Sequence, residues 1–185
     1  MPSLIASAFV AGFFILSGAE AASAPTGPVE PPLPVFSVTL TSYNAVPGQT
    51  DEDPMTTASG LYSNPEVIAA RSRDLAKDLP FGTVVAIERT ASDTNNCRFG
   101  QVEHLIGYRV IGDSMNARMQ NRVDVLLDQN DTVTVGGKSL NPSRVLGVCN
   151  EVTVRVVGYM KLKDVPKTQE ALVEMLGGTS RVAVR

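Results

Sequence analysis

Tryptophan is absent from the 185-residue chain, histidine occurs once, at His104, and aromatic residues make up only 5% of the sequence. Cysteine is also scarce, and the two residues present, Cys97 and Cys149, lie far apart. One histidine and two isolated cysteines do not supply the four closely spaced ligands that structural zinc sites use. No P-loop and no Gly-x-Gly-x-x-Gly motif follows an expected strand, so nucleotide-binding signatures are missing too. We therefore expect neither a metal nor an organic cofactor.

An excess of basic residues is missing as well. The 16 Lys and Arg residues face 19 Asp and Glu residues, for a net charge of −3. Removing residues 1–24 takes away one acid, Glu20, and no base, so the remaining chain carries −2. Proteins that bind nucleic acids usually present a basic face, and this balance argues against that class of partner.

The N-terminus predicts export. From Leu4 to Ala19 the residues are almost all apolar, and Ala22-Ser23-Ala24 places small residues at the −3 and −1 positions of a signal-peptidase site. The apolar run is shorter than the roughly 20 residues that cross a bilayer. We predict a cleaved signal peptide at residues 1–24, no stable membrane span after cleavage, and a periplasmic or secreted protein. The alternative is an uncleaved anchor.

Cysteine usage agrees with an oxidising compartment. An even pair such as Cys97 and Cys149 is a candidate disulfide in an exported protein. An unstrained bridge of this kind would stabilise the fold by roughly 2–4 kcal/mol.

The rest of the chain predicts a β-rich domain. Residues 25–34 contain Pro25, Pro28, Pro31, Pro32 and Pro34 and are expected to form a semi-rigid spacer. Alternating apolar and β-branched residues predict strands at 35–43, 83–88, 105–111, 122–127, 145–148 and 151–159 and a short hairpin at 132–137, with a further short apolar run at 67–70. Helical turns are expected at 72–79, with Ser72 as N-cap, and at 167–176, whereas residues 90–104 are expected to be irregular and Gly112 to end a strand. Many short strands at close spacing favour a small closed barrel over a sandwich.

Carboxylates are the main candidates for chemistry. His104 lies in a polar stretch with no nucleophile motif, and we expect it to be a surface residue. Asp124 instead stands between Val123 and Val125 within an expected strand. Partial burial there would raise its pKa and let it hold a proton near neutral pH, as a general acid must. The alternative is that Asp124 pairs with Arg118 or Arg122 at the rim.

Six short blocks, in order, resemble the three-aspartate domain found in membrane-bound lytic transglycosylase A and in the stationary-phase-survival muralytic proteins. These blocks are Thr57-Ala58-Ser59-Gly60, Ile68-Ala69, Ser72-Arg73-Asp74-Leu75, Leu79-Pro80-Phe81-Gly82-Thr83, Asp113-Ser114-Met115-Asn116-Ala117-Arg118 and Asn121-Arg122-Val123-Asp124. The resemblance spans residues 38 to about 160, most of the chain after the signal peptide.

The resemblance implies a mainly β fold, a small six-stranded double-psi β-barrel related to the rare-lipoprotein-A and expansin barrels. One short helix is expected between the strands, the barrel domain at residues 35–162, and a C-terminal helix and tail at 163–185. The residues carried over as catalytic are Asp124, Asp113 and Asp74. Those carried over as substrate-binding are Thr57, Ser59, Gly60, Asn121 and Arg122.

The activity implied is cleavage of peptidoglycan glycan strands by a monomeric lytic transglycosylase, with Asp124 as general acid and base. A glycoside hydrolase using a second aspartate is one alternative. A non-catalytic, expansin-like binding module is another, although a chain without tryptophan has few rings on which sugars could stack. A third is a barrel that serves a protein partner of the wall machinery, since Met115 and Asn116 stand where many members carry glycines.

Overall fold

The computed structural model describes residues 32–50 and 52–177. The predicted signal peptide, most of the proline-rich spacer and the last eight residues, 178–185, lie outside the described residues. Within the described part of the chain, no helix combines the length and the apolar character needed to cross a membrane.

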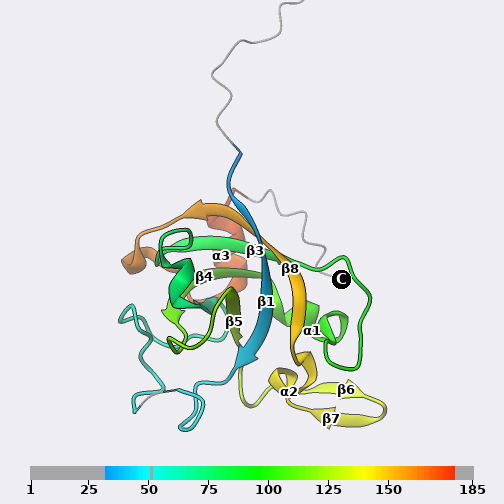
Figure 1. Ribbon diagram of the computed structural model, residues 1–185. Coiled ribbons are helices and arrows are strands. Elements are labelled where there is room, and N and C mark those ends of the chain that lie inside the picture. Colours follow the sequence, from blue (N-terminus) through cyan, green and yellow to red (C-terminus); the bar gives the residue numbers. More distant parts are fainter. Residues whose placement is uncertain (1–31, 51, 178–185) are drawn as a thin grey trace, which may run out of the picture. The chain divides into compact units, whose positions relative to one another are not determined.

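Six strands close into a barrel, and the prediction of a mainly β, closed six-stranded barrel is confirmed (Figure 1). Around the barrel the order is β1 (Val35–Tyr43), β5 (Arg122–Leu126), β2 (Ile68–Arg71), β4 (Tyr108–Ser114), β3 (Thr83–Glu88) and β8 (Cys149–Tyr159). The pairs β1–β5 and β2–β4 are parallel, and the other neighbours are antiparallel. Strands far apart in the sequence therefore become neighbours, which brings the segments 35–43, 68–71, 108–114 and 122–126 into one surface.

Both faces of the central strands are covered, which explains their nearly continuous apolar sequences. Alternate residues of all six strands fill the barrel interior, among them Leu40, Ala69, Val85, Ile111, Val125 and Val154. The intervening residues form a second cluster on the outer face with Leu172 of the C-terminal helix, among them Ile68, Ala70, Val84, Val110 and Leu126. A polar side chain on the outer face of β4 or β5 therefore lies beside this second cluster.

Gly112 makes a β-bulge in β4. The parallel register runs Ile111 opposite Ala69 and then Asp113 opposite Ala70, so Gly112 is the extra residue. A Cβ atom at Gly112 would lie 2.8 Å from Cδ1 of Ile68, a contact too short for any other residue without movement. Side chains alternate along a strand, so without the bulge Asp113 would share the interior face with Ile111. The expectation that Gly112 ends the strand is wrong, because β4 continues to Ser114.

Short helices and one hairpin lie between the barrel strands, and two further short helices follow the last strand. They are η1 (Arg73–Ala76), α1 (Phe99–Ile106), the hairpin β6 (Val133–Val135) with β7 (Lys138–Leu140), α2 (Pro142–Leu146), η2 (Leu162–Asp164) and α3 (Gln169–Met175). Figure 1 shows the hairpin projecting from the barrel beside α2. The hairpin and the C-terminal helix are confirmed, and Gly177 follows α3 with φ +81°, as a helix stop requires.

Two segments differ from the expected elements. The stretch expected to be irregular contains most of α1, whose residues Phe99, Val102 and Ile106 bury one face of the helix. Half of the expected strand at 145–148, Val145 and Leu146, belongs to α2, whose N-cap Asn141 accepts a hydrogen bond from the backbone N–H of Ser143. At 145–148 apolar residues of a short segment are interpreted with the period of a strand, whereas at 90–104 the helical spacing of the apolar residues is overlooked.

Ser72 holds the N-cap position of η1, but the expected capping bond is not formed. Its hydroxyl oxygen instead accepts a hydrogen bond from the backbone N–H of Arg122, at the start of β5. The hydroxyl therefore joins η1 to a neighbouring strand of the barrel.

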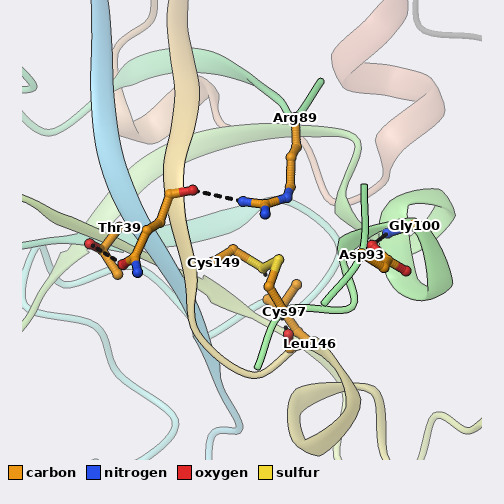
Figure 2. The surroundings of a disulfide bond; sticks show 8 residues. Thr39, Arg89, Asp93, Cys97, Gly100, Leu146 and Cys149 are labelled. Atoms are coloured by element: carbon orange, nitrogen blue, oxygen red, sulfur yellow. Dashed lines mark hydrogen bonds between the residues drawn. A yellow bond between two sulfur atoms is a disulfide. The ribbon is translucent and has the colours of Figure 1, made fainter. Parts of the chain in front are cut away.

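A disulfide joins Cys97 to Cys149 (Figure 2). It links the segment before α1 to the first residue of β8, and both cysteines are buried. Nearby, Arg89 donates to the carbonyl of Asn150 at 2.7 Å, and the backbone N–H of Gly100 donates to Asp93 at 2.9 Å (Figure 2). The predicted bridge is confirmed.

Arg109 on β4 is the largest fully buried side chain. Its guanidinium donates to the backbone carbonyls of Pro65, Ile68, Leu105, Ile106 and Leu126, and it forms no ion pair with a carboxylate of the described residues. Burial lowers the pKa of Arg109 to about 10, so the side chain stays charged at neutral pH. The positive charge lies at the C-terminal end of α1, where the helix dipole favours it.

Candidate functional site

A row of four residues crosses four neighbouring strands of the barrel. Thr41 on β1 pairs with Asp124 on β5, Asp124 pairs with Ala70 on β2, and Ala70 pairs with Asp113 on β4. Residues directly opposite one another across a sheet point to the same face. With strands roughly 5 Å apart, the Cα atoms of the two aspartates lie roughly 10 Å apart across the small side chain of Ala70. The fold thus brings Asp113 and Asp124 together.

A cleft of about 460 Å³ opens over this row. Its walls come from the chain between β1 and β2, from η1, and from the β4–β5 connection. The lining residues are Tyr43, Gly48, Gln49, Thr50, Pro54, Thr56, Ser63, Ala70, Arg73, Asp113, Ser114, Met115, Asn116, Arg118, Met119 and Asp124. The two aspartates therefore lie in a cavity large enough for part of a ligand, on the outer face of the barrel.

Asp124 has the environment of a general acid. Burial raises the pKa of its carboxyl group to about 6, against the opposing effects of a hydrogen bond from Thr41 and the charge of Arg122. The Thr41 hydroxyl donates to Oδ1 at 2.8 Å. Within residues 32–50 and 52–177 neither Arg118 nor Arg122 forms an ion pair with Asp124, so the rim pairing considered from the sequence is not formed.

Asp113 is held by three donors. The phenol of Tyr43 donates to Oδ2 at 2.8 Å, and the backbone N–H groups of Ala58 and Ser114 donate to Oδ1 at 2.9 and 2.8 Å. Both carboxylate oxygens are therefore engaged within the protein. This leaves Asp113 less available than Asp124 to exchange a proton with a ligand.

Tyr43 was not singled out from the sequence, although it lines the cleft. Its side chain is only 7% exposed, and burial followed by the charge of Asp113 raises the pKa of the phenol far above its ordinary value. The phenol therefore remains a proton donor to Asp113 at every pH at which the protein would work. The available signal was its position on β1, two residues after Thr41 on the same face.

Asp74 does not lie in the cleft. Its Oδ2 accepts from the backbone N–H of Asn121 at 2.9 Å, and its carboxylate is exposed. Hydrogen bonds from the Ser72 hydroxyl and then from Asn121 lower the pKa of Asp74. Asn121 has a φ of +47°, an unfavourable backbone conformation, and its amide also donates to the carbonyl of Ser37. Asp74 therefore supports the turn that leads into β5.

The other residues expected to bind substrate also lie outside the cleft lining. Arg122 and Asn121 begin β5 beside β1. Thr57 is buried, and its hydroxyl exchanges a hydrogen bond with Ser59 and accepts from the backbone N–H of Leu61. Gly60 has φ +81° in the same turn. This turn fixes the backbone N–H of Ala58 on Asp113, so its contribution to the site is indirect.

His104 is exposed on α1 and does not line the cleft. Across the described residues no group of three His, Cys, Asp or Glu side chains is close enough to hold a metal ion. The cleft residues that the sequence did not suggest are mostly polar side chains and methionines, such as Gln49, Ser63, Met115 and Met119.

Comparison of the chain with protein-family models finds no match, and comparison with the curated proteins finds none either.

Proposed function

We propose that the protein cleaves peptidoglycan glycan strands as a lytic transglycosylase, with Asp124 as general acid and then general base. The observation that carries the proposal is the placement of Asp124: a partly buried carboxyl group with its pKa near 6, in a cleft, with one oxygen held by Thr41. A carboxyl group in this state can both deliver and recover a proton near neutral pH. Within the proposal, the barrel is the double-psi barrel of the three-aspartate family that the sequence blocks resemble.

The reaction needs only one carboxyl group. Protonated Asp124 donates its proton to the glycosidic oxygen as the bond from the muramyl C1 to that oxygen breaks. The resulting carboxylate then takes the proton of the muramyl 6-hydroxyl while the 6-oxygen bonds to C1. The products are a 1,6-anhydro ring and a free 4-hydroxyl group, and Asp124 is protonated again.

The surroundings of Asp113 favour this reaction over hydrolysis. A hydrolase needs a second carboxylate, free to act as base or nucleophile, roughly 5–9.5 Å from the acid. Both oxygens of Asp113 already accept hydrogen bonds from Tyr43, Ala58 and Ser114. We assign Asp113 an electrostatic role, since its charge is one of the effects that raise the pKa of Asp124.

The test is a digest of purified peptidoglycan, with products identified by mass spectrometry. Wild type is expected to release anhydromuropeptides, and Asp124→Asn to be slower by roughly 10²–10⁴-fold, because the amide cannot transfer a proton. Asp78→Asn, which removes an exposed carboxylate outside the cleft, is the matched control and should keep wild-type activity.

Other products would point elsewhere. Reducing-end products that disappear in Asp124→Asn would identify a hydrolase. No products, together with co-sedimentation of both proteins with the insoluble wall, would identify the binding module. Full activity in Asp124→Asn would eliminate the mechanism.

A further inference from the structure

Two arginines, Arg73 and Arg118, line the cleft that holds the two aspartates. Arg73 belongs to η1, which precedes β3, and Arg118 to the connection between β4 and β5. Both side chains are exposed. In the described part of the chain the one ion pair joins Arg155 to Glu88, so neither cleft arginine is paired with a carboxylate of residues 32–50 or 52–177.

The backbone holds both arginines in defined positions. Met115 donates from its backbone N–H to the carbonyl of Arg71, and the N–H of Arg118 donates to Oδ1 of Asn116, which fixes the turn carrying Arg118. Arg73 is the first residue of η1, directly after Ser72, whose backbone N–H bonds to the carbonyl of Arg122. Hydrogen bonds thus hold the two backbone segments that carry the arginines at the cleft.

The charges in the cleft constrain what it can bind. Asp113 alone would repel an anionic ligand, whereas the two arginines attract one, and a neutral sugar would leave their positive charges uncompensated. Guanidinium groups bind carboxylates through paired N–H donors. We propose that Arg73 and Arg118 bind a carboxylate of the wall polymer next to the sugar that reacts at Asp124, and so select glycan that carries free carboxylates. This inference rests on the proposed function and names its substrate class.

Two parts of peptidoglycan supply that chemistry. The lactyl group of muramic acid ends in a carboxylate where the stem peptide has been removed, and the stem peptides carry carboxylates of their own. Each source offers a carboxylate to the two arginines, and the experiment distinguishes the lactyl carboxylate from those of the stem peptides.

A second pair of arginines provides a matched control. Arg98 and Arg144 line a different groove, beside Val148 and the disulfide-linked segment, and form no ion pair among the described residues. Replacing either pair removes two positive charges from the protein, but only replacement of Arg73 and Arg118 changes the cleft.

The experiment measures binding with no turnover, using the full-length sequence with Asp124→Asn. The probes are native peptidoglycan, peptidoglycan whose carboxylates have been converted to amides with carbodiimide and ammonia, and glycan strands freed of stem peptides by an amidase. Native wall is expected to bind about tenfold or more tightly than amidated wall. Adding Arg73→Gln with Arg118→Gln should remove that difference, and adding Arg98→Gln with Arg144→Gln should leave it intact.

Retained binding to the stem-free glycan would assign the lactyl carboxylate, and lost binding the stem-peptide carboxylates. The inference would be overturned if replacing Arg73 and Arg118 weakened binding to neither the native wall nor the stem-free glycan, or if the two arginine pairs caused equal losses. This experiment measures binding and not cleavage. Its result is therefore independent of the peptidoglycan digest that tests the proposed function.

Discussion

At the scale of single residues, the two aspartates of the row differ in their hydrogen bonds and in their burial. Asp113 accepts three hydrogen bonds, whereas Asp124 accepts one and is buried enough for its pKa to reach about 6. Within the proposed mechanism these unequal environments leave proton transfer to Asp124 and an electrostatic role to Asp113. The difference arises from the burial of Asp124 and from donors to Asp113, of which Tyr43 and Ala58 lie far from either aspartate in the sequence.

Because the pKa of Asp124 is raised, replacing its carboxyl group by a neutral amide should stabilise the folded protein at high pH and not at low pH. The folded state holds the proton more tightly than the unfolded chain does, so the contribution of Asp124 is fully favourable below pH 3.8 and is lost as pH rises through about 6. An asparagine side chain at this position would keep an oxygen for Thr41 and carry no charge. Asp124→Asn should therefore raise the free energy of unfolding at pH 8 by about 1–3 kcal/mol and change it little at pH 4.

Urea denaturation at the two pH values measures this effect. Asp78→Asn, an exposed site, should show no comparable difference between pH 4 and pH 8. A loss of stability in Asp124→Asn at pH 8 would show that the carboxylate is stabilised where it lies, contrary to a burial-raised pKa.

The sequence could predict part of this site. A carboxylate between Val123 and Val125 is unusual enough to notice from one strand alone. A role for Asp113 follows only from the family resemblance. The residues next to it in the sequence do not predict its three hydrogen-bond donors. Tyr43 and Thr41 were missed because their importance depends on the parallel β1–β5 pairing, which the residues of either strand do not specify. Asp74 was placed with the other aspartates, but its partner is the backbone of Asn121.

At the scale of elements, the bulge in β4 determines which face carries Asp113. Gly112 adds one residue on β4 opposite β2, and its carbonyl accepts from the backbone N–H of Ser59. The glycine therefore couples the strand to the turn whose Ala58 binds Asp113. A single backbone irregularity aligns the two carboxyl groups.

Gly112→Ala should disturb this arrangement. Its Cβ would lie 2.8 Å from Cδ1 of buried Ile68 and 3.2 Å from Cδ1 of Leu61, so we expect destabilisation by about 1–3 kcal/mol and a lower activity than the stability loss alone explains. Gly158→Ala is the control, because that strand glycine has only Cδ2 of Leu176 at 3.7 Å. Urea midpoints and digest rates of the two variants test the prediction, which equal effects at the two positions would contradict.

The elements themselves were partly predictable. The strands expected at 35–43 and 122–127 are found as Val35–Tyr43 and Arg122–Leu126, because both period and composition indicate a strand there. The segments of α1 and α2 are only eight and five residues long, so periodicity does not separate helix from strand there. Gly112 was interpreted as a strand end because a glycine at a bulge and a glycine at a turn look alike in the sequence.

At the scale of the whole molecule, the disulfide closes a loop of the chain that contains both cleft aspartates. Cys97 and Cys149 are 52 residues apart, and the segment between them contains β4 and β5 with both cleft aspartates. The bridge restricts the unfolded chain over that segment. The disulfide therefore stabilises the folded state of the segment whose strands β4 and β5 carry the two cleft aspartates.

Replacing both cysteines by alanine should lower the free energy of unfolding by about 3–4 kcal/mol, since the closed segment is long. Urea denaturation with and without a reducing agent measures the change, and the reducing agent should affect wild type only. A difference below about 1 kcal/mol would show that the unfolded chain is already restricted by other structure.

The neighbours of β1 carry a consequence for the order in which the chain folds. The first strand pairs with β5 on one side and with β8, the last strand, on the other. No barrel can close on a ribosome until residues up to Tyr159 have emerged. Contacts so distant in sequence are also slow to form, because the intervening chain must first be ordered. The nascent chain therefore cannot complete its barrel through most of its synthesis, and early segments such as β1 wait for partners that are made much later.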